Sequence, residues 1–403
     1  NAKWMNHPFR MKALGDTMFA LGVNRFIFHR YAMQPWTNRA PGMTMGQYGV
    51  HFERTNTWWE MSTAYLTYLA RCQHLLQQGR FVADVAYLNS EKAPNLHPGR
   101  EALTPSMPAG YDYDIVPPEV LLTAANVEQG RITLASGMKY RVLVLPSGDT
   151  MRPALLEKIK QLVADGATVI GPPPHRSPSL TGYPAADAEV RRLARELWGD
   201  CDGNSVNEHR FGKGKIVWGV PIGDVLRGFG PMPDFSVIGP RTAQTVNYIH
   251  RLIDGTDVYF VASPQAGETT FLCSFRVSGR APELWWPDTG RIERIAVYDT
   301  VPEGTRIPIR LGPYGSVFVV FPKDGSPVDQ VVAATRDNIE ITGMQGTSPT
   351  DLRRSQQGIR IERAEGGGFE LETARGGAYE LRTASGRRLR HEVPSLPSPI
   401  EIA

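Results

Sequence analysis

The chain has 403 residues, of which 41% are hydrophobic and 21% are charged, which is an ordinary composition for globular proteins and a length typical of several domains. The chain has 44 Lys and Arg and 41 Asp and Glu, so its net charge is only +3. A charge this small favours neither nucleic acid nor a membrane surface as a partner. The three cysteines are far apart and imply no disulfide framework or paired-cysteine metal site, and no apolar run is long enough to span a bilayer.

The chain opens with a helix signal followed by a strand signal. Apolar residues at helical spacing predict a helix over 11–21, and Gly22 suits the position just after its C-terminus. The apolar run 23–28 predicts a buried parallel strand, because such strands are covered on both faces. Polar residues follow this run at once, as they do where a barrel strand leaves the core.

A long link and a second helix complete this first part. The link over 32–54 is rich in Pro and Gly, and a link of this length without structure of its own is usually functional. A helix is predicted over 58–78, with Thr57 and Glu60 at the spacing of a capping box. The order of helix, strand, long loop and helix predicts that residues 1–80 are the truncated last part of a (β/α)8 barrel.

Residues 81–235 have the pattern of a flavodoxin-like α/β domain. The clearest signal is a βαβ unit with strands at 142–145 and 167–170 and a helix at 153–165. The first of these strands leads into LVLPSGDT, which is not a glycine-rich phosphate loop, and no cysteine follows a strand as an amidotransferase nucleophile would. We therefore predict a structural module here rather than a flavin or nucleotide site.

The rest of the chain reads as β-structure. A short helix is predicted over 242–253, and from residue 257 the apolar period changes to two, which predicts a β-sandwich over 236–323. Weaker and more polar strand signals predict a second, incomplete β-domain over 324–403. Since the chain starts with Asn and ends on a strand-like segment, we expect both termini to be truncation points in a longer protein.

Groups suited to sugar recognition gather after the first predicted strand. His29 and Arg30 end the strand, and Gln34 and Trp36 follow in the link. Active sites of α/β barrels lie at the C-terminal ends of the strands. Cationic, hydrogen-bonding and aromatic side chains at that place indicate a carbohydrate-active enzyme, although a lone histidine is more often structural.

Two glutamates near the second predicted helix need separate interpretations. Glu53 lies close to His51 and Arg54 in sequence. Its carboxylate could serve as a general acid or base, accept hydrogen bonds from sugar hydroxyls, or form an ion pair with Arg54. Glu60 is better explained by its capping-box spacing from Thr57.

Five tryptophans are candidates for stacking on a sugar ring. Trp36 and Trp59 are favoured, because Trp58 belongs to the apolar stripe of the predicted helix. Trp285 and Trp286 are adjacent in a predicted strand, so they point to opposite faces and at most one belongs to a core.

The first part of the chain resembles the last part of the barrel of glycoside hydrolase family 106, the α-L-rhamnosidases. The resemblance rests on NHPFRMKALGDTMFALGVNRFIFHRYAMQPW and on PGMTMGQYGVHFERTNTWWEMSTAYLTYLARCQHLLQQGRFVADVAYL. It is dense over residues 5–90, continues through LVLPSGDTMRPALLEKIKQLVADGATVIGPPP and YIHRLIDGTDVYFVAS, and thins beyond about residue 323.

This resemblance implies a large, inverting glycosidase that hydrolyses terminal rhamnosyl linkages in plant or microbial glycans. It implies two catalytic glutamates, a nearby calcium ion, and a periplasmic or secreted location. The two glutamates belong to earlier barrel strands, so the fragment alone is expected to be inactive, with Glu53 as the fallback acid or base. The expected contributions to the sugar pocket are His29, Arg30, Gln34, Trp36, His51, Glu53 and Trp59.

Two alternatives stay open. One is another barrel glycosidase, such as a β-galactosidase-like enzyme, which must satisfy a hydroxyl at C6 where rhamnose has a methyl group. The other is a carbohydrate-binding protein without catalysis, which predicts sugar binding through Trp285 or Trp286 and no role for His29. Oligomeric state, linkage and calcium ligands do not follow from the sequence.

Overall fold

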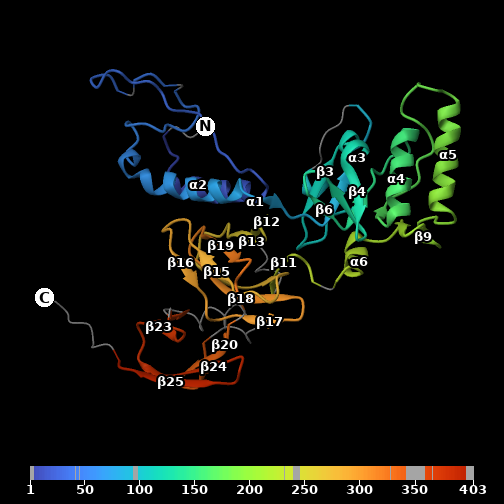
Figure 1. Ribbon diagram of the computed structural model, residues 1–403. Coiled ribbons are helices and arrows are strands. Elements are labelled where there is room, and N and C mark those ends of the chain that lie inside the picture. Colours follow the sequence, from blue (N-terminus) through green and yellow to red (C-terminus); the bar gives the residue numbers. More distant parts are fainter. Residues whose placement is uncertain are drawn as a thin grey trace. The chain divides into compact units, whose positions relative to one another are not determined.

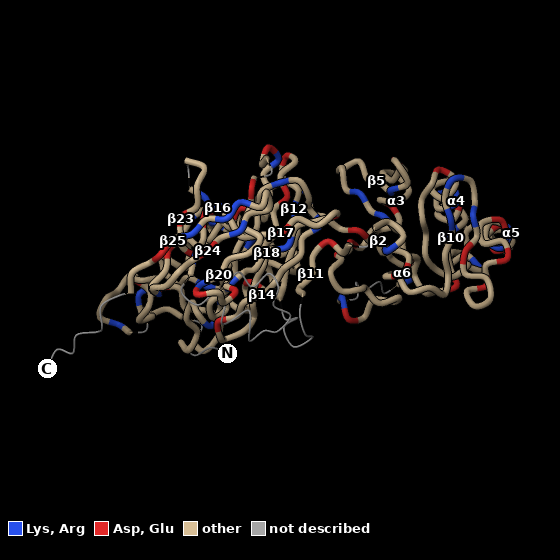
Figure 2. The backbone as a smooth tube through the Cα atoms, turned by 90° about the horizontal axis from the view of Figure 1, so that it is seen from below, with Lys and Arg blue, Asp and Glu red and all other residues tan. Residues whose placement is uncertain are grey.

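A computed structural model of the chain describes most of its residues (Figure 1). The described ranges are 4–40, 42–44, 46–93, 99–230, 232–238, 246–326, 328–341, 359–364 and 366–395. The chain folds into two compact units, of which one combines Asn1–Gly79 with Phe235–Ala403 and the other is Arg80–Asp234. Lys and Arg lie interspersed with Asp and Glu in both units, in keeping with the small net charge (Figure 2).

The first predicted helix is confirmed, and the second begins later than predicted. The structure has α1 (Pro8–Ala20), the 3-10 turn η1 (Trp59–Met61) and α2 (Thr63–Leu76). Gly22 has φ of +97°, the left-handed conformation that favours glycine after a helix. Because α2 starts after Ser62, Thr57 cannot be its N-cap, and the capping-box interpretation of Glu60 is wrong.

The predicted strand over 23–28 is not a strand. These residues pair with no strand in the described part of the chain. Ile27 is 91% exposed, whereas Phe26 packs against Phe19 at 4.7 Å and its N–H donates to Gln73 Oε1 at 2.6 Å. An apolar run becomes a strand only when neighbours satisfy its backbone, and here α1 and α2 offer side chains instead.

A buried polar cluster attaches α1 and α2 to the β-structure of the same unit. The Lys12 ammonium donates to Asp16 at 2.6 Å, to the Tyr314 carbonyl at 2.7 Å and to Ser316 Oγ at 2.9 Å. Tyr68 donates its hydroxyl to the same Asp16 carboxylate. Burial raises the pKa of Asp16 although Lys12 opposes this shift.

That β-structure is a sandwich of two antiparallel sheets. Within this unit the strands of the first sheet have the order β12 (Asn247–Ile253), β13 (Thr256–Ala262), β19 (Ser316–Phe321), β15 (Glu283–Trp285) and β16 (Ile292–Arg294). The second has the order β11 (Phe235–Ile238), β14 (Thr269–Phe275), β18 (Gly304–Leu311) and β17 (Asp299–Val301). Their facing side chains form one buried apolar core, as alternation with period two requires.

The helix predicted over 242–253 is wrong, because β12 occupies its described part. Asp254 and Gly255 have φ of +48° and +90°, and they connect β12 to β13 as a two-residue hairpin turn. Asp-Gly between apolar runs is a strong hairpin signal that outweighs the weak helical spacing before it. Residues 242–245 of that prediction lie outside the described residues.

A smaller β-structure follows in the same unit. One sheet has the order β21 (Ile339–Glu340), β20 (Val331–Arg336), β24 (Gly377–Thr383) and β25 (Arg388–Val393), and the hairpin beside it is β22 (Ile359–Arg363) with β23 (Phe369–Thr373). Bridges from Ile295 to Glu362 and from Val297 to Val331 join it to the sandwich.

The second unit is a mixed α/β sheet with helices on both faces. The sheet order is β3 (Tyr113–Val116), β2 (Val85–Leu88), β7 (Val142–Val144), β8 (Thr168–Ile170), β10 (Gly214–Val217) and β9 (Glu208–Phe211). All neighbours are parallel except the edge pair β10 and β9. The five parallel strands thus have the order 2-1-3-4-5 that is typical of flavodoxin-like folds.

The predicted βαβ unit is confirmed by β7, α4 (Pro153–Asp165) and β8. Side chains of α3 (Pro118–Ala124), α4 and α5 (Ala185–Trp198) bury one face of the sheet, and α6 (Ile222–Arg227) covers the other. The unit also contains β1 (Arg80–Phe81), the turn η2 (Arg100–Ala102) and a small sheet of β4 (Ala125–Glu128), β5 (Arg131–Leu134) and β6 (Lys139–Tyr140).

Candidate functional site

Two backbone hydrogen bonds bring the separate parts of the predicted sugar site together. The Arg30 N–H donates to the Val50 carbonyl at 3.0 Å, and the Val50 N–H donates to the His29 carbonyl at 2.7 Å. Gly49 has φ of +77°, and a Cβ there would lie 2.6 Å from the His29 carbonyl oxygen, so only glycine allows this close approach. The end of the apolar run therefore lies beside the segment that carries His51 and Glu53.

Glu53 is the buried centre of this region, with only 2% of its surface exposed. Its Oε2 accepts hydrogen bonds from Gln34 Nε2 at 2.6 Å and from the Thr55 N–H at 2.9 Å, and its Oε1 accepts the Thr55 hydroxyl. These neutral donors fix the position of the Glu53 carboxyl group. Its geometry suits it to orient Gln34.

Arg54 does not pair with Glu53, contrary to one of the interpretations of the sequence. Its guanidinium instead donates to the carbonyls of Gln34 at 2.7 Å and Trp36 at 2.6 Å. Gln34 is thereby fixed twice, through its side chain by Glu53 and through its backbone by Arg54. These roles of Arg54 and Thr55 were not predicted from the sequence.

His51 is buried rather than open to solvent. Its ring stacks on Trp4 with centroids 3.7 Å apart, and Nε2 lies 2.9 Å from the Gly46 carbonyl. Since a carbonyl only accepts, the proton is on Nε2, and a neutral ring then leaves a lone pair on Nδ1. Among the described residues Nδ1 has no hydrogen-bond partner. That nitrogen is buried.

The remaining predicted contacts lie at the surface of the same region. His29 and Arg30 are exposed, Trp36 is 49% exposed with Arg39 over its ring at 5.3 Å, and Trp59 is half-buried in η1. These side chains are accessible at the surface, whereas Glu53 and His51 are buried.

Trp58 has a structural place, as its apolar neighbours suggest. Its indole packs edge-on against Phe52 at 5.4 Å and donates to the Asn6 carbonyl at 3.0 Å. Phe52 in turn packs on Phe28 at 4.3 Å. Glu60 is exposed in η1, so it and Glu53 occupy very different environments.

The described residues do not provide the calcium site that the resemblance implies. No group of three or more His, Cys, Asp or Glu side chains is arranged to hold a metal in the described ranges. Calcium takes six to eight oxygen ligands, so this part of the chain does not fit the ion by itself. In the same ranges no helix is both long and apolar enough to cross a membrane.

A protein-family model matches the chain, and individual proteins are similar to it. The family model is that of glycoside hydrolase family 106, alpha-L-rhamnosidase, and it matches residues 1–300. A protein of Formosa agariphila named "Putative beta-glucuronidase" is 39% identical over 333 residues, which are 82% of this chain and 27% of that protein.

The solved structure of a rhamnosidase from Novosphingobium sp. PP1Y is also similar. Its TM-score is 0.72 at 30% sequence identity, and the match covers 83% of this chain and 32% of that chain. The present chain thus spans between about a quarter and a third of the length of these two proteins.

Proposed function

The chain belongs to glycoside hydrolase family 106, and from this premise we propose that it forms the closing segment of the catalytic barrel of an inverting α-L-rhamnosidase, together with the domains that follow. The observation that supports this most is the cluster around Glu53, where groups suited to sugar hydroxyls are fixed beside an uncovered apolar run. The segment 23–28 is apolar at four of its six positions and exposes Ile27, as a barrel strand would without its neighbours.

In this proposal the segment 29–59 binds one face of the sugar. His29, Gln34 and Arg30 present donors and acceptors to hydroxyl groups, and the exposed rings of Trp36 and Trp59 present apolar faces to C–H groups. Glu53 orients Gln34 from below, so it is a positioning residue. Apolar and aromatic walls also suit the methyl group at C6 of rhamnose.

Cleavage requires two carboxyl groups. In an inverting glycosidase one protonates the leaving oxygen and the other activates a water on the opposite ring face, and the two are roughly 6.5–9.5 Å apart. Because the Glu53 carboxylate is already occupied by Gln34 and Thr55, we propose that both catalytic groups come from barrel strands encoded upstream of this chain.

A β-glucuronide is the second candidate substrate. The exposed Arg30 favours it, since a guanidinium pairs well with the carboxylate that a uronic acid carries at C5. Rhamnose carries no charge that could pair with the Arg30 guanidinium. The two substrates therefore differ in whether their binding needs the positive charge of Arg30.

The test is the hydrolysis of three nitrophenyl glycosides by a protein that extends this chain upstream to a full barrel. We expect release of nitrophenol from the α-L-rhamnoside, little from the β-D-galactoside or β-D-glucuronide, and none from the shorter chain. Activity on the glucuronide that Arg30→Gln abolishes would establish the second candidate. Activity of the short chain alone would refute the upstream location of the catalytic groups.

A further inference from the structure

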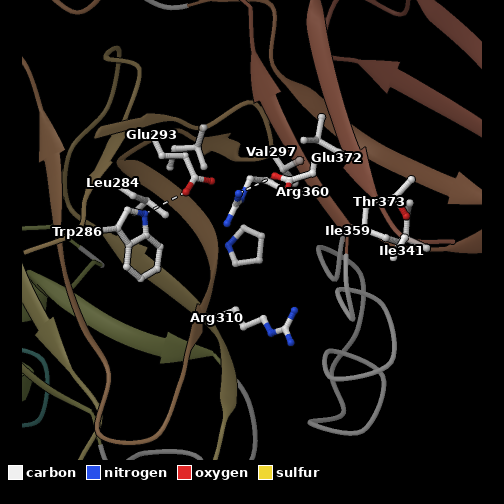
Figure 3. A pocket seen from close by; sticks show the side chains of 14 residues that line it. Leu284, Trp286, Glu293, Val297, Arg310, Ile341, Ile359, Arg360, Glu372 and Thr373 are labelled. Carbon is white, nitrogen blue, oxygen red and sulfur yellow. Dashed lines mark hydrogen bonds and ion pairs between the residues drawn. The ribbon is translucent and has the colours of Figure 1, made fainter. Parts of the chain in front are cut away.

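A cavity of about 540 Å³ lies between the sandwich and the smaller β-structure, within one compact unit. This volume is in the range of about 300–1,000 Å³ that ligand sites occupy. Figure 3 shows Trp286, Glu293 and Leu284 on the sandwich side and Ile341, Ile359 and Thr373 on the other. None of the residues that line it comes from the segment 29–59.

Trp286 forms an oriented aromatic wall of this cavity. It is half-buried against the sandwich core, and its Nε1 donates to Glu293 Oε2 at 3.0 Å (Figure 3). Glu293 is only 7% exposed, and burial raises the pKa of its carboxyl group. The hydrogen bond fixes the indole in one position, so the wall is preformed.

The charged groups around the cavity balance one another. Arg360 pairs with Glu372 at 2.6 Å, and Arg310 pairs with Glu268 at 2.6 Å. With each cation matched by a carboxylate, the cavity has no excess charge to attract an anion. It still presents N–H donors and carboxylate acceptors beside isoleucine side chains, a mixture that suits a ligand with both hydroxyl groups and an apolar face.

We propose that this cavity binds a neutral saccharide, with C–H groups of the ring on Trp286 and hydroxyl groups on Glu293 and Arg310. A sugar is the ligand class that combines an uncharged ring face with many hydroxyls, and the chain belongs to a family of carbohydrate-active enzymes. The proposal concerns binding only, so it is independent of the barrel and of the reaction proposed for it.

Trp285 provides a matched control. It is adjacent in sequence and also donates from Nε1 to a glutamate, Glu283, at 2.8 Å. In the register of β15 and β19 it pairs with Phe318, on the face of the sheet opposite to Leu284 and the cavity. Replacement of Trp285 therefore removes an equivalent side chain without touching the proposed site.

The experiment is calorimetric titration of the present chain with L-rhamnose, D-galactose and D-glucuronate. We expect a neutral sugar to bind with Kd of about 1 mM. Trp286→Ala should weaken this binding by about tenfold or more, which is about 1.4 kcal/mol. Trp285→Ala should leave it unchanged.

Arg310→Ala is the second variant, because Trp286 also packs on the core and its loss can disturb folding. Arg310 is a partly exposed rim residue, so its removal should weaken sugar binding with little effect on the melting temperature. Binding of D-glucuronate alone, no binding of either neutral sugar, or equal losses in the Trp285 and Trp286 variants would each overturn the proposal. None of these results depends on hydrolysis.

Discussion

Glu53 stabilises the loop of the candidate site by accepting hydrogen bonds from Gln34, which precedes it in sequence, and from Thr55, which follows it. In Glu53→Ala the Gln34 amide and the Thr55 N–H lose their acceptor in a buried place. An unsatisfied buried donor destabilises a protein by about 1–3 kcal/mol, so urea unfolding should show a loss of that size. Glu60→Ala removes an exposed carboxylate nearby and should change stability by less than about 0.5 kcal/mol. Equal effects of the two substitutions would contradict the role given to Glu53.

Asp112 makes the second unit sensitive to pH. Burial raises its pKa to about 7, although Arg100 lies 3.2 Å away and opposes the shift. In the unfolded chain the group ionises near its ordinary value, so between about pH 4 and pH 7 the folded state binds more protons and loses stability as pH rises. Above about pH 7 the loss is complete.

Asp112→Asn tests this directly, because the amide stays neutral at every pH. The variant should gain about 2 kcal/mol relative to the unchanged chain between about pH 5 and pH 7, measured by chemical unfolding at a series of pH values. A difference between the two proteins that does not change with pH would show that Asp112 has no raised pKa.

At the level of residues, the sequence predicts which types of side chain lie in the candidate site but not which of them contact one another. His29, Arg30 and Trp36 are exposed where the end of an apolar run suggested. The burial of His51 depends on Trp4, which is 47 residues away in the chain and stacks on its ring. Contacts of this kind follow from the path of the loop, which local patterns do not encode.

The hairpin of β12 and β13 depends on its two-residue turn. Gly255→Ala places a side chain at φ of +90°, and left-handed backbone is unfavourable by about 1–2 kcal/mol for residues with a Cβ. A loss of this size in thermal unfolding is expected. Gly267→Ala is the control, because its φ is not left-handed and a Cβ there meets no described atom within 4 Å. The turn would be unimportant if both variants melted together.

At the level of elements, strongly periodic segments were predictable and context-dependent ones were not. The unit formed by β7, α4 and β8 follows the sequence closely, because each part buries its own apolar face. The segment 23–28 has Asn24 and Arg25 between its apolar residues and lacks pairing neighbours in the described structure. Composition determines what a segment can bury, whereas pairing also requires a second strand.

At the level of the whole molecule, the helices on either side of the candidate sugar loop contact β-structure that lies far from them in sequence. The cluster of Lys12, Asp16 and Tyr68 fixes α1 and α2 on the sandwich, so the segment between these helices is anchored at both ends. The cavity at Trp286 is formed by strands about 75 residues apart, such as β15 and β22, which is why the sequence only suggested a tryptophan and not a pocket.

We propose that exposed groups of the segment 29–59 contact the sugar substrate. The most direct measurement is kcat/KM for an aryl α-L-rhamnoside in the protein extended to a full barrel, with His29→Ala compared with His74→Ala. His74 is an exposed histidine on α2, outside the segment, and controls for the loss of the side chain. We predict a decrease of about 10–100-fold for His29→Ala, equivalent to about 1.4–2.7 kcal/mol of transition-state binding, and no change for His74→Ala. Equal kcat/KM values in the two variants would contradict the account.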